Sequence, residues 1–533
     1  MAAPPALTSP PTARPWAADR DAATDCQTAV FTKLLVANRG EIALRVIRAC
    51  RELGIASVAV YSDADAHAPH VREADEAIHI GPAPAAQSYL VGERILEAAR
   101  RTGAQAVHPG YGFLSEREWF ARAVRDAGLV WVGPPAEAIA AMGSKTAART
   151  LAVSAGVPVV PGTTTALRDA DEAREVATRF GFPVLLKAAA GGGGKGMRVV
   201  RNADELPSAL ASAQREALNA FGDDAVYVEK YIEGPRHVEI QVLGDTHGTM
   251  LHLGERECSV QRRHQKMIEE APSIAVTPEL RARMGATAVA AARAAGYVNA
   301  GTCEFLLDQH GNYYFLEMNT RIQVEHPVTE LVTGIDLVQW QIRIAAGERL
   351  PFVQEALVPR GWAMECRITS EDFQNGFLPS TGRVTSMQIP SGPGVRWDGG
   401  IEVGTDVGLF YDPMLAKLIV YADTRAAAIA RMHRALLELE IEGVETSREF
   451  HLRMMEDEEF RRGDITIQWL EAKLPALSAI EPSGDDVRIA VIAAALMAER
   501  DRTSVAAAQP TAATSDDSSA WQRAARHEGL RRA

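Results

Sequence analysis

Five polar residues alternate with less polar ones along a single short segment. They are Glu317, Asn319, Arg321, Gln323 and Glu325. Residues at this spacing share one face of an extended strand. Two carboxylates, two carboxamides and a guanidinium on one face could bind a cation and an anion side by side. A solvated strand face would give the same alternation, but the apolar run directly before the segment favours a buried position.

A second carboxylate is expected across from this segment. Two strand-like runs flank a Gln-His-Gly-Asn loop at residues 309–312, which is a composition typical of a hairpin. If Asp308 pairs with Tyr313, then Glu304 lies opposite Glu317, and two like charges at that distance repel each other. A divalent cation would remove this conflict, since Mg²⁺ and Mn²⁺ prefer oxygen ligands. Alternatively, one carboxyl group is protonated or is paired with an arginine.

A glycine-rich segment is the next candidate. A strand-like run at 183–187 ends in Lys187, and glycines at 191–194 separate it from a second run at 197–200. This arrangement lacks the Walker and Rossmann patterns, but backbone amides without side chains can still bind phosphates. A lysine at the end of an apolar strand needs an anion, and an ATP phosphate would serve. A glycine run alone can also be no more than a mobile loop.

Two more segments are compatible with a nucleotide site. Residues 226–232 contain a strand-like run whose apolar surface and backbone suit the edge of an adenine base. Residues 262–266 form the densest basic cluster of the ordered chain and could bind a second anion next to a phosphate. Each segment alone would be interpreted as an ordinary strand end or surface loop.

The elements around these segments predict a multidomain protein of α/β and α+β class. A strand at 33–37, a helix at 41–53 and a strand at 57–61 are typical of a parallel α/β domain. The length of 533 residues allows about two to four domains with sizeable cores. The expected divisions are a disordered leader at 1–30, an N-terminal parallel α/β domain at 31–141, a central domain at 142–349, a mixed α+β domain at 350–475, and an Ala-rich linker and tail at 476–533.

Composition excludes several functional classes. The net charge is −13 without a long basic stripe, which argues against a nucleic-acid-binding protein. The five cysteines are scattered and show no CxxC spacing, so we expect neither disulfides nor a zinc site, and a reducing cytoplasm is the expected compartment. No stretch of about 20 apolar residues could span a membrane.

Four segments together resemble the signatures of the biotin carboxylase subunit of biotin-dependent carboxylases, which belong to the ATP-grasp superfamily. They lie at residues 35–43, 108–116, 261–266 and 317–327. The last segment reads Glu-Met-Asn-Thr-Arg-Ile-Gln-Val-Glu-His-Pro, a run that other ATP-grasp ligases do not share. The resemblance covers about residues 33–474. It implies a central ATP-grasp fold whose glycine-rich loop belongs to a movable lid at about 160–235.

The resemblance also implies a reaction and its residues. ATP would phosphorylate bicarbonate to carboxyphosphate, and the carboxyl group would then pass to N1′ of biotin. The implied ATP ligands are Lys145, Lys187, Gly193, Gly194, Glu229, Lys230, Ile232, His237, Gln261, His264 and Leu306. The implied ligands of two Mg²⁺ or Mn²⁺ ions are Glu304, Glu317 and Asn319. The implied bicarbonate contacts are Lys266, Arg321, Gln323 and Val324.

Three of these residues would be catalytic in the family pattern. Glu325 would be the base that deprotonates bicarbonate, Arg321 would stabilise the biotin anion, and Lys266 would act with them. Arg367 and Tyr111 would contact biotin. A carboxylate base is required because bicarbonate is a poor nucleophile until its proton leaves.

The expected partners follow from what the chain lacks. No Ala-Met-Lys-Met-like string is present, since residues 495–498 read Ala-Leu-Met-Ala without a lysine. We therefore expect biotin on a separate carrier protein and a carboxyltransferase as a second partner, with a homodimer implied by the resemblance. The reaction would serve an acetyl-CoA or propionyl-CoA carboxylase, as in fatty acid biosynthesis, or alternatively a pyruvate carboxylase. Another ATP-grasp ligase and a non-catalytic scaffold are competing hypotheses, which residues 321–325 disfavour.

Overall fold

The computed structural model describes most of the chain. The described residues are 31–163, 166–167, 169–188, 197–221, 223–479 and 484–507. The predicted leader and the glycine run, including Gly193 and Gly194, therefore lie outside the described residues. The chain divides into two compact units, Met1–Leu477 and Ser478–Ala533.

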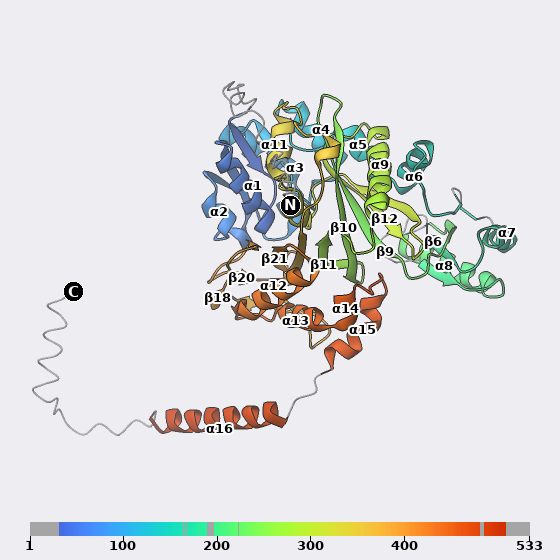
Figure 1. The fold of residues 1–533 in the computed structure, drawn as a ribbon. Helices are drawn as coiled ribbons and strands as arrows, with labels where there is room; N and C mark the ends of the chain where they lie inside the picture. Colours follow the sequence, from blue (N-terminus) through green and yellow to red (C-terminus); the bar gives the residue numbers. More distant parts are fainter. Residues whose placement is uncertain are drawn as a thin grey trace, which may run out of the picture. The chain divides into compact units, whose positions relative to one another are not determined.

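The N-terminal part is built on a five-stranded parallel sheet, as predicted (Figure 1). Its order is β3-β2-β1-β4-β5, formed by β1 (Lys33–Val36), β2 (Ala56–Ser62), β3 (Glu76–Gly81), β4 (Ala106–His108) and β5 (Val130–Trp131). Leu34 and Val36 belong to one hydrophobic core, while Leu35 and Ala37 belong to another. Both faces of the sheet are thus buried, as expected when helices cover a parallel sheet on each side.

A larger antiparallel sheet of eight strands runs through the rest of the first unit. Its order is β13-β12-β9-β10-β11-β14-β21-β19. The strands are β9 (Arg236–Gly244), β10 (Met250–Arg262), β11 (Gln265–Ala271), β12 (Asn299–Leu307), β13 (Tyr313–Asn319), β14 (Trp362–Thr369), β19 (Val395–Gly399) and β21 (Met414–Ala422). Because β11 pairs with β14, backbone hydrogen bonds continue across the boundary expected near residue 349.

Helices and short strands complete the fold. The α-helices are α1 (Gly40–Glu52), α2 (Pro69–Glu73), α3 (Gly92–Thr102), α4 (Glu118–Asp126), α5 (Ala136–Gly143), α6 (Lys145–Ser154), α7 (Ala170–Phe180), α8 (Leu206–Phe221), α9 (Pro278–Ala294), α10 (His326–Thr333), α11 (Leu337–Ala345), α12 (Arg425–Glu438), α13 (Arg448–Glu456), α14 (Glu458–Arg462), α15 (Trp469–Ser478) and α16 (Gly484–Ala507). The 3₁₀ helices are η2 (Asp63–Asp65), η3 (Ala85–Gln87) and η4 (Gln354–Ala356). Two-stranded pairings join β15 (Glu371–Asp372) to β16 (Leu378–Pro379), β17 (Gly382–Arg383) to β20 (Asp406–Val407), and β18 (Ser386–Gln388) to β22 (Glu440–Glu442).

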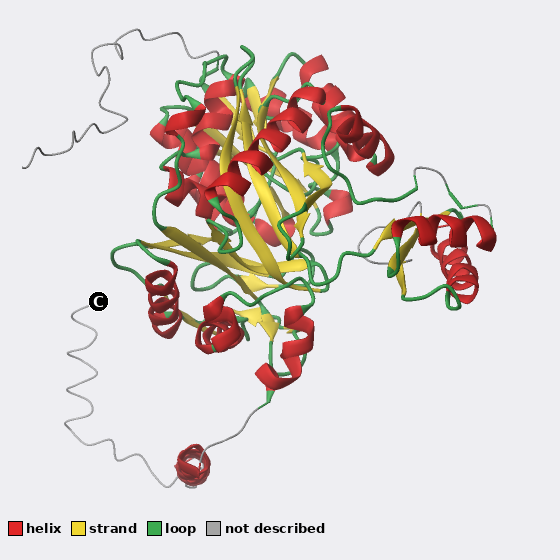
Figure 2. Ribbon diagram, turned by 45° about the vertical axis from the view of Figure 1, so that its right-hand side comes forward, coloured by secondary structure: helices red, strands yellow, loops and turns green. Residues whose placement is uncertain are grey.

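A third sheet forms a small body of its own, which we call the lid. It consists of β7 (Met197–Val200), β6 (Val184–Ala188) and β8 (Val226–Lys230), with α7 and α8 packed on it. Figure 2 shows it standing to one side of the large sheet. Its core is separate, since Leu186, Val200 and Val228 cluster with residues of the two helices. The predicted strands on both sides of the glycine run are confirmed.

The hairpin β12–β13 brings Glu304 opposite Glu317, as predicted, but the strand register near the turn differs from the predicted one. The expected pairing of Asp308 with Tyr313 does not occur, because Leu307 takes that position. A register shift directly after the Glu304 pair then restores the expected alignment. The shift leaves Leu316 as an extra residue, which is the definition of a β-bulge.

The extended geometry expected through Glu325 holds only as far as Asn319, where β13 ends. The backbone N–H of Thr320 donates to the Glu116 carboxylate at 3.1 Å instead of continuing the strand ladder. Glu325 is the N-cap residue of α10, and Pro327 occupies its first turn, where proline is favoured. The second half of the polar segment is therefore a connection between a strand and a helix.

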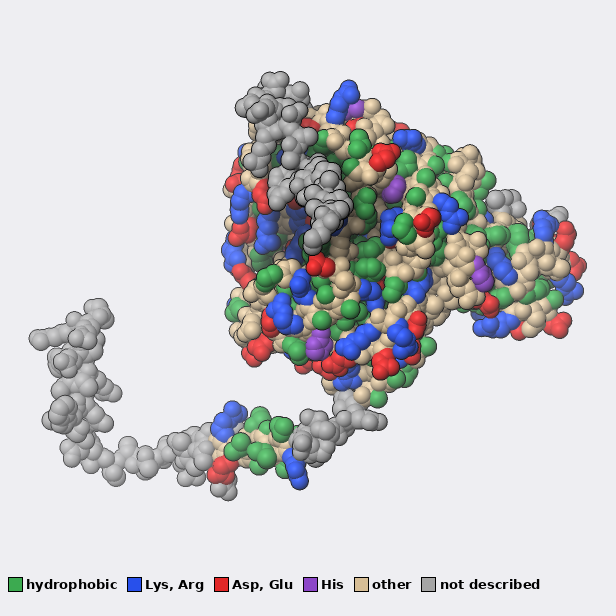
Figure 3. All heavy atoms as spheres, in the orientation of Figure 1, with side chains coloured by type: hydrophobic (Ala, Val, Ile, Leu, Met, Phe, Trp, Pro, Cys, Tyr) green, Lys and Arg blue, Asp and Glu red, His purple; other side chains and the backbone are tan. Residues whose placement is uncertain are grey.

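The expected Ala-rich linker contains a helix. The structure has α16 within residues 476–533, because alanine has the highest helix propensity of all residues. Its apolar side chains are exposed, with Ile489 at 65% and Leu496 at 66% (Figure 3). None of its described residues belongs to a hydrophobic core cluster. Among the described helices, none combines the length and apolar character needed to cross a membrane.

Truncation of the chain after Leu477 tests the independence of the two units. We expect the melting temperature of the shortened protein to change by less than about 2 °C, because the described part of the removed unit buries nothing in the cores. Thermal unfolding followed by circular dichroism measures this. A decrease of more than about 5 °C would contradict it.

Candidate active site

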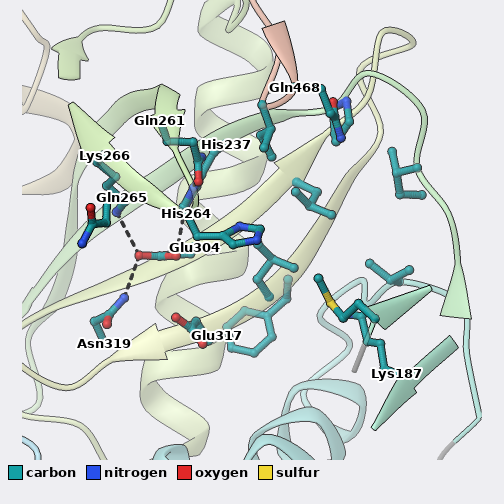
Figure 4. Close-up of a pocket in the computed structure, with 18 of the residues that line it drawn as sticks. Lys187, His237, Gln261, His264, Gln265, Lys266, Glu304, Glu317, Asn319 and Gln468 are labelled. Carbon is teal, nitrogen blue, oxygen red and sulfur yellow. Dashed lines mark hydrogen bonds and ion pairs between the residues drawn. The ribbon is translucent and has the colours of Figure 1, made fainter. Parts of the chain in front are cut away.

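A cavity of about 900 Å³ lies where the lid, the hairpin β10–β11 and the strands β12–β14 face one another. Figure 4 shows its lining side chains converging from several strands. Most of the predicted site residues line it, namely Lys187, Glu229, Lys230, Ile232, His237, Gln261, His264, Lys266, Glu304, Leu306, Glu317, Asn319, Arg321, Gln323, Val324, Glu325 and Arg367. Residues far apart in the sequence thus meet around one space.

The remaining predicted residues lie elsewhere or outside the description. The Tyr111 hydroxyl donates a hydrogen bond to the Glu41 carboxylate, and Tyr111 is not among the residues that line the cavity. Lys145 begins α6, but the described structure does not extend to its side chain. Gly193 and Gly194 lie outside the described residues.

Glu304 is the most densely bonded of the predicted metal ligands. Its Oε1 accepts from Lys266 Nζ at 3.0 Å, Asn319 Nδ2 at 2.8 Å and Gln323 Nε2 at 2.9 Å. Its Oε2 lies 2.9 Å from His237 Nε2 (Figure 4). Burial acts to raise the pKa of Glu304, but the charges of Lys266 and His237 outweigh it and hold that pKa well below its usual range. Glu304 is thus ionised and paired with a lysine, not with the arginine considered from the sequence.

Lys266 binds three carboxylates at once. Its Nζ lies 2.6 Å from Glu239 Oε2, 3.0 Å from Glu304 Oε1 and 2.7 Å from Glu325 Oε1. Burial acts to lower the pKa of Lys266, but the three carboxylates raise it well above its usual value. A buried ammonium therefore stays charged at the centre of the site.

A tight turn sets the position of Lys266. The two residues between β10 and β11, Arg263 and His264, have φ angles of 48° and 65°. Positive φ at both central positions is typical of the type I′ turn in two-residue hairpins, which normally favours asparagine and glycine. The turn pairs Gln261 with Lys266 across the hairpin, so both side chains reach the cavity. Residues whose backbone adopts this sparsely populated conformation are common at functional sites.

Glu325 is held between two cations. Its Oε1 accepts from Lys266 at 2.7 Å and its Oε2 from Arg367 at 3.0 Å, and only 2% of the residue is exposed. Burial acts to raise the pKa of Glu325, but Lys266, Arg367 and Arg256 lower it strongly. The carboxylate is therefore ionised and able to accept a proton.

Arg321 connects the site to the N-terminal part of the chain. Its Nε donates to Glu116 Oε2 at 3.0 Å, and another of its nitrogens donates to Asn319 Oδ1 at 3.1 Å. Burial acts to lower the pKa of Arg321, but Glu116 and more distant carboxylates raise it. Glu116 belongs to the segment at 108–116, so two of the four signature segments meet at this ion pair.

The lid contributes its own charged residues to the cavity. Lys187 donates to the Glu229 carboxylate from the neighbouring strand, and Arg149 lies 3.5 Å from the same carboxylate. Lys230 Nζ donates to the carbonyl oxygens of Gly181 at 2.8 Å and Phe182 at 3.3 Å. The anion that Lys187 was expected to need is thus Glu229 in this structure.

Several residues that hold the site in place are missing from the sequence-based prediction. Arg256 is fully buried and donates to five acceptors, which are Glu239, Gln241, Thr302, Gln323 and Thr329. Lys417 is also fully buried, and its Nζ donates to the carbonyl of Val324 at 2.9 Å and lies 3.2 Å from Glu41 Oε2. Charged residues inside otherwise apolar strands were the available signal, because a buried charge needs a partner.

Three family models match consecutive parts of the chain. They describe the biotin carboxylase N-terminal domain at residues 30–139, the carbamoyl-phosphate synthase L chain ATP-binding domain at 144–353, and the biotin carboxylase C-terminal domain at 365–472. Biotin carboxylase 1 of Bacillus subtilis is 52% identical over 443 residues, which cover 83% of this chain and 98% of that protein. The chain belongs to the biotin carboxylase family. The predicted fold class, with its central ATP-grasp domain, is confirmed.

Further relatives of this biotin carboxylase come from different carboxylases. A pyruvate carboxylase component of Methanothermobacter thermautotrophicus is 53% identical over 442 residues, covering 83% of this chain and 90% of that protein. Propionyl-CoA carboxylase alpha chain of Ruegeria pomeroyi is 49% identical over 500 residues, covering 89% and 73%.

Solved structures also resemble this biotin carboxylase. The biotin carboxylase domain dimer of Hydrogenobacter thermophilus 2-oxoglutarate carboxylase, in complex with MgADP, ADP and bicarbonate, has a TM-score of 0.78 and 49% identity, covering 85% of this chain and 99% of that one. A biotin carboxylase–β,γ-ATP complex from Campylobacter jejuni has a TM-score of 0.78 and 47% identity, covering 83% and 99%. The competing hypothesis of a different ATP-grasp ligase is not supported, because the flanking models on both sides are those of biotin carboxylase.

Replacing Arg256 tests the buried charge network. Arg256→Met should lower the free energy of unfolding by about 3–5 kcal/mol, because Glu239 Oε1 and several polar groups stay buried without the donor that Arg256 supplies. Chemical denaturation measures the loss. Arg343→Met is the matched control, since its pair with Glu348 is 37% and 44% exposed and should contribute less than about 1 kcal/mol. Equal losses in the two variants would contradict a special role for Arg256.

Proposed function

We propose that this chain catalyses the ATP-dependent carboxylation of biotin held on a carrier protein, with bicarbonate as the carboxyl source and carboxyphosphate as the intermediate. One observation carries the proposal. An ionised carboxylate, Glu325, lies between Lys266 and Arg367 in the same cavity as the opposed acidic pair Glu304 and Glu317. A base, an anion-binding group and a cation-binding pair are therefore within one space.

The acidic pair fits divalent cations. Glu304 and Glu317 are opposite each other on adjacent strands, and Asn319 adds a carboxamide that bonds to Glu304. These are hard oxygen donors of the kind that Mg²⁺ and Mn²⁺ prefer. These three residues would hold two such ions, which when bound neutralise the charge of the ATP phosphates. Lys266, already 3.0 Å from Glu304, would bring a further positive charge to the same phosphates.

ATP would bind between the lid and the large sheet. Lys187, Glu229, Lys230 and Ile232 approach from the lid side, and His237, Gln261, His264 and Leu306 from the strands opposite. The relative in complex with β,γ-ATP and the one in complex with MgADP support this assignment. Lys145, Gly193 and Gly194 remain predictions that rest on the resemblance alone.

Bicarbonate would bind next to Glu325, against Lys266, Arg321, Gln323 and the backbone of Val324. A strongly lowered pKa makes Glu325 a weak proton acceptor while both of its oxygens are bonded to cations. An incoming bicarbonate shares Lys266 with Glu325, which weakens the hold of the lysine and raises the proton affinity of the carboxylate. The bicarbonate proton then moves to Glu325, and the freed oxygen attacks the γ-phosphorus of ATP, while the bond from that phosphorus to the β,γ-bridging oxygen breaks and ADP leaves.

Biotin would then meet carboxyphosphate near the two arginines. A bond would form from N1′ to the carboxyl carbon, the bond from that carbon to the phosphate oxygen would break, and the released phosphate would take the N1′ proton. Arg321 would stabilise the biotin anion that forms when N1′ loses its proton, and Arg367 would contact biotin or carboxyphosphate. Tyr111 donates to Glu41 in this structure, so its contact with biotin stays a prediction that rests on the resemblance. Preorganised cations at the position of developing negative charge are an effective form of catalysis.

The carboxyl acceptor and the partners are the finer part of the proposal. We favour an acetyl-CoA or propionyl-CoA carboxylase, with a carrier protein, a carboxyltransferase, a homodimer, and a cytoplasmic role in fatty acid biosynthesis. A pyruvate carboxylase is the alternative. Relatives named for propionyl-CoA, pyruvate and 2-oxoglutarate carboxylases have similar sequence identities to this chain. Sequence similarity therefore does not identify the carboxyl acceptor.

Bicarbonate-dependent ATP hydrolysis stimulated by free biotin is the direct test. Glu325→Gln should lower the turnover number by about 100-fold or more, because general bases contribute about 10²–10⁴-fold, while ATP binding stays intact. Steady-state kinetics and ATP titration measure the two effects. Glu348→Gln, at an exposed ion pair, is the control and should keep full activity. Absence of any biotin response in the wild-type protein would refute the proposed function.

The final carboxyl acceptor depends on the partner carboxyltransferase, so it is tested with the native complex. We expect the enzyme purified with its native partners to carboxylate acetyl-CoA or propionyl-CoA. Incorporation of labelled bicarbonate, with pyruvate and 2-oxoglutarate as competing acceptors, measures this. Labelling of a keto acid alone would overturn the acyl-CoA assignment and leave the biotin carboxylation intact.

A further inference from the structure

Two carboxyl groups oppose each other behind Arg367, outside the predicted set of site residues. Glu269 on β11 and Glu365 on β14 are direct partners in the antiparallel register. Both are completely buried. Directly opposed side chains in such a pair have Cβ atoms about 4.5–5.5 Å apart and point to the same face. Two negative charges at that distance without water would repel strongly.

The two carboxyl groups need one more hydrogen to complete their hydrogen bonding. Glu269 Oε1 accepts from Arg367 Nε at 2.6 Å. Within the described part of the chain, Glu269 Oε2 and both carboxyl oxygens of Glu365 have no hydrogen-bond partner. Buried polar atoms without a hydrogen-bond partner lower the stability of the folded protein. A proton on Glu365 that is donated to Glu269 Oε2 would satisfy both residues.

The cations near Glu365 are already bound to other acceptors. Arg367 lies between Glu269 and Glu325, and Lys266 binds three other carboxylates. Lys417, the strand neighbour of Arg367, donates to a backbone carbonyl and pairs with Glu41. Among the described residues, Tyr111 and Cys258 also interact electrostatically with the pair, and Cys366 follows Glu365 on β14 with its side chain in the core on the opposite face. No cation in this described surrounding is bonded to Glu365.

The electrostatics agree with this geometry. Burial raises the pKa of Glu269 to about 7, although Arg367 acts to lower it. Burial also raises the pKa of Glu365 well above its usual value, against the charge of Lys417. Arg367 already bonds to Glu269 and Glu325, so it does not neutralise a third carboxylate, that of Glu365.

We propose that Glu269 and Glu365 share one proton at neutral pH and together act as positioning residues for Arg367. This inference rests on the proposed function, in which Arg367 contacts biotin or carboxyphosphate. With one proton, the pair carries a single negative charge, which holds one side of the guanidinium while Glu325 holds the other. Loss of that proton adds a second negative charge that draws Arg367 away from Glu325. Gain of a second proton releases Arg367 from Glu269.

Two neutral substitutions distinguish the roles of the partners. Glu365→Gln resembles the protonated side chain and can donate its N–H to Glu269, so kcat/KM for biotin at neutral pH should stay within about twofold of wild type. Glu269→Gln removes the charge that holds Arg367, so the same constant should fall by about 10- to 100-fold, as expected for a lost hydrogen bond to a charged group.

A matched control separates positioning from folding. Glu270 is adjacent to Glu269 on β11 and is also buried, but it pairs with Arg425 and not with Arg367. Glu270→Gln should lower the melting temperature without a selective loss of kcat/KM for biotin. If Glu269→Gln and Glu270→Gln lower kcat/KM to the same extent, or if Glu365→Gln is as harmful as Glu269→Gln, the proposal is wrong.

The pH dependence gives a readout that does not require Glu269→Gln to fold. A carboxyl group with a raised pKa binds more protons in the folded than in the unfolded state, so stability falls as pH rises from the usual carboxyl range to about 7. The melting temperature of Glu365→Gln should therefore exceed that of wild type by a margin that grows from pH 5 to pH 8. The alkaline decline of kcat/KM for biotin should be shifted or absent in this variant.

Infrared difference spectroscopy detects the shared proton directly. The wild-type protein at neutral pH should show a protonated-carboxyl band that Glu365→Gln lacks. Identical spectra and identical pH profiles would overturn the shared proton. A wild-type protein with no biotin-stimulated ATP hydrolysis would instead refute the proposed function, so the two failures can be told apart.

Discussion

The site depends on one buried ammonium, that of Lys266. Three buried carboxylates, two from strands and one from the start of α10, meet at its Nζ, and without it Glu239, Glu304 and Glu325 would repel one another. Removal of one partner from a buried ion pair is strongly destabilising, because an uncompensated charge remains. Arg256 adds a second cation beneath Glu239. The arrangement of the strands around Lys266 is thus fixed by charge as well as by apolar packing.

The same constraint explains why one sheet passes through two predicted domains. Arg367 must reach Glu325, and it does so from β14, the strand that pairs with β11, where Lys266 lies. Lys417 on the neighbouring strand β21 donates a hydrogen bond to the backbone carbonyl of Val324. A hinge between the central and C-terminal regions would separate these groups. The lid has its own core and needs no such rigidity.

The sequence predicted local structure better than the contacts between distant residues. The strands beside the glycine run and the opposition of Glu304 and Glu317 follow from local periodicity, and both are confirmed. The bulge at Leu316 was not predictable, because a register shift depends on the packing of the neighbouring strand. The pairs Glu269–Glu365 and Lys417–Glu41 join residues far apart in the chain, and nothing in a single sequence specifies such partners. Most site residues came from the family resemblance rather than from periodicity.

The balance of charge in the cavity indicates how substrates must enter. Among the described residues, the cavity is lined by seven lysines and arginines and by six carboxylates, so its lining is close to neutral; they are Arg149, Lys187, Lys230, Arg262, Lys266, Arg321 and Arg367, and Glu229, Glu304, Glu317, Glu325, Glu371 and Asp412. Most of these cations are already paired with carboxylates, so a bare polyphosphate gains little net attraction. Divalent cations between the acidic strand pair and the phosphates would supply that attraction. On the proposed function, nucleotide binding would therefore be coupled to metal binding by charge, and bicarbonate would compete for the two cations that Glu325 already holds.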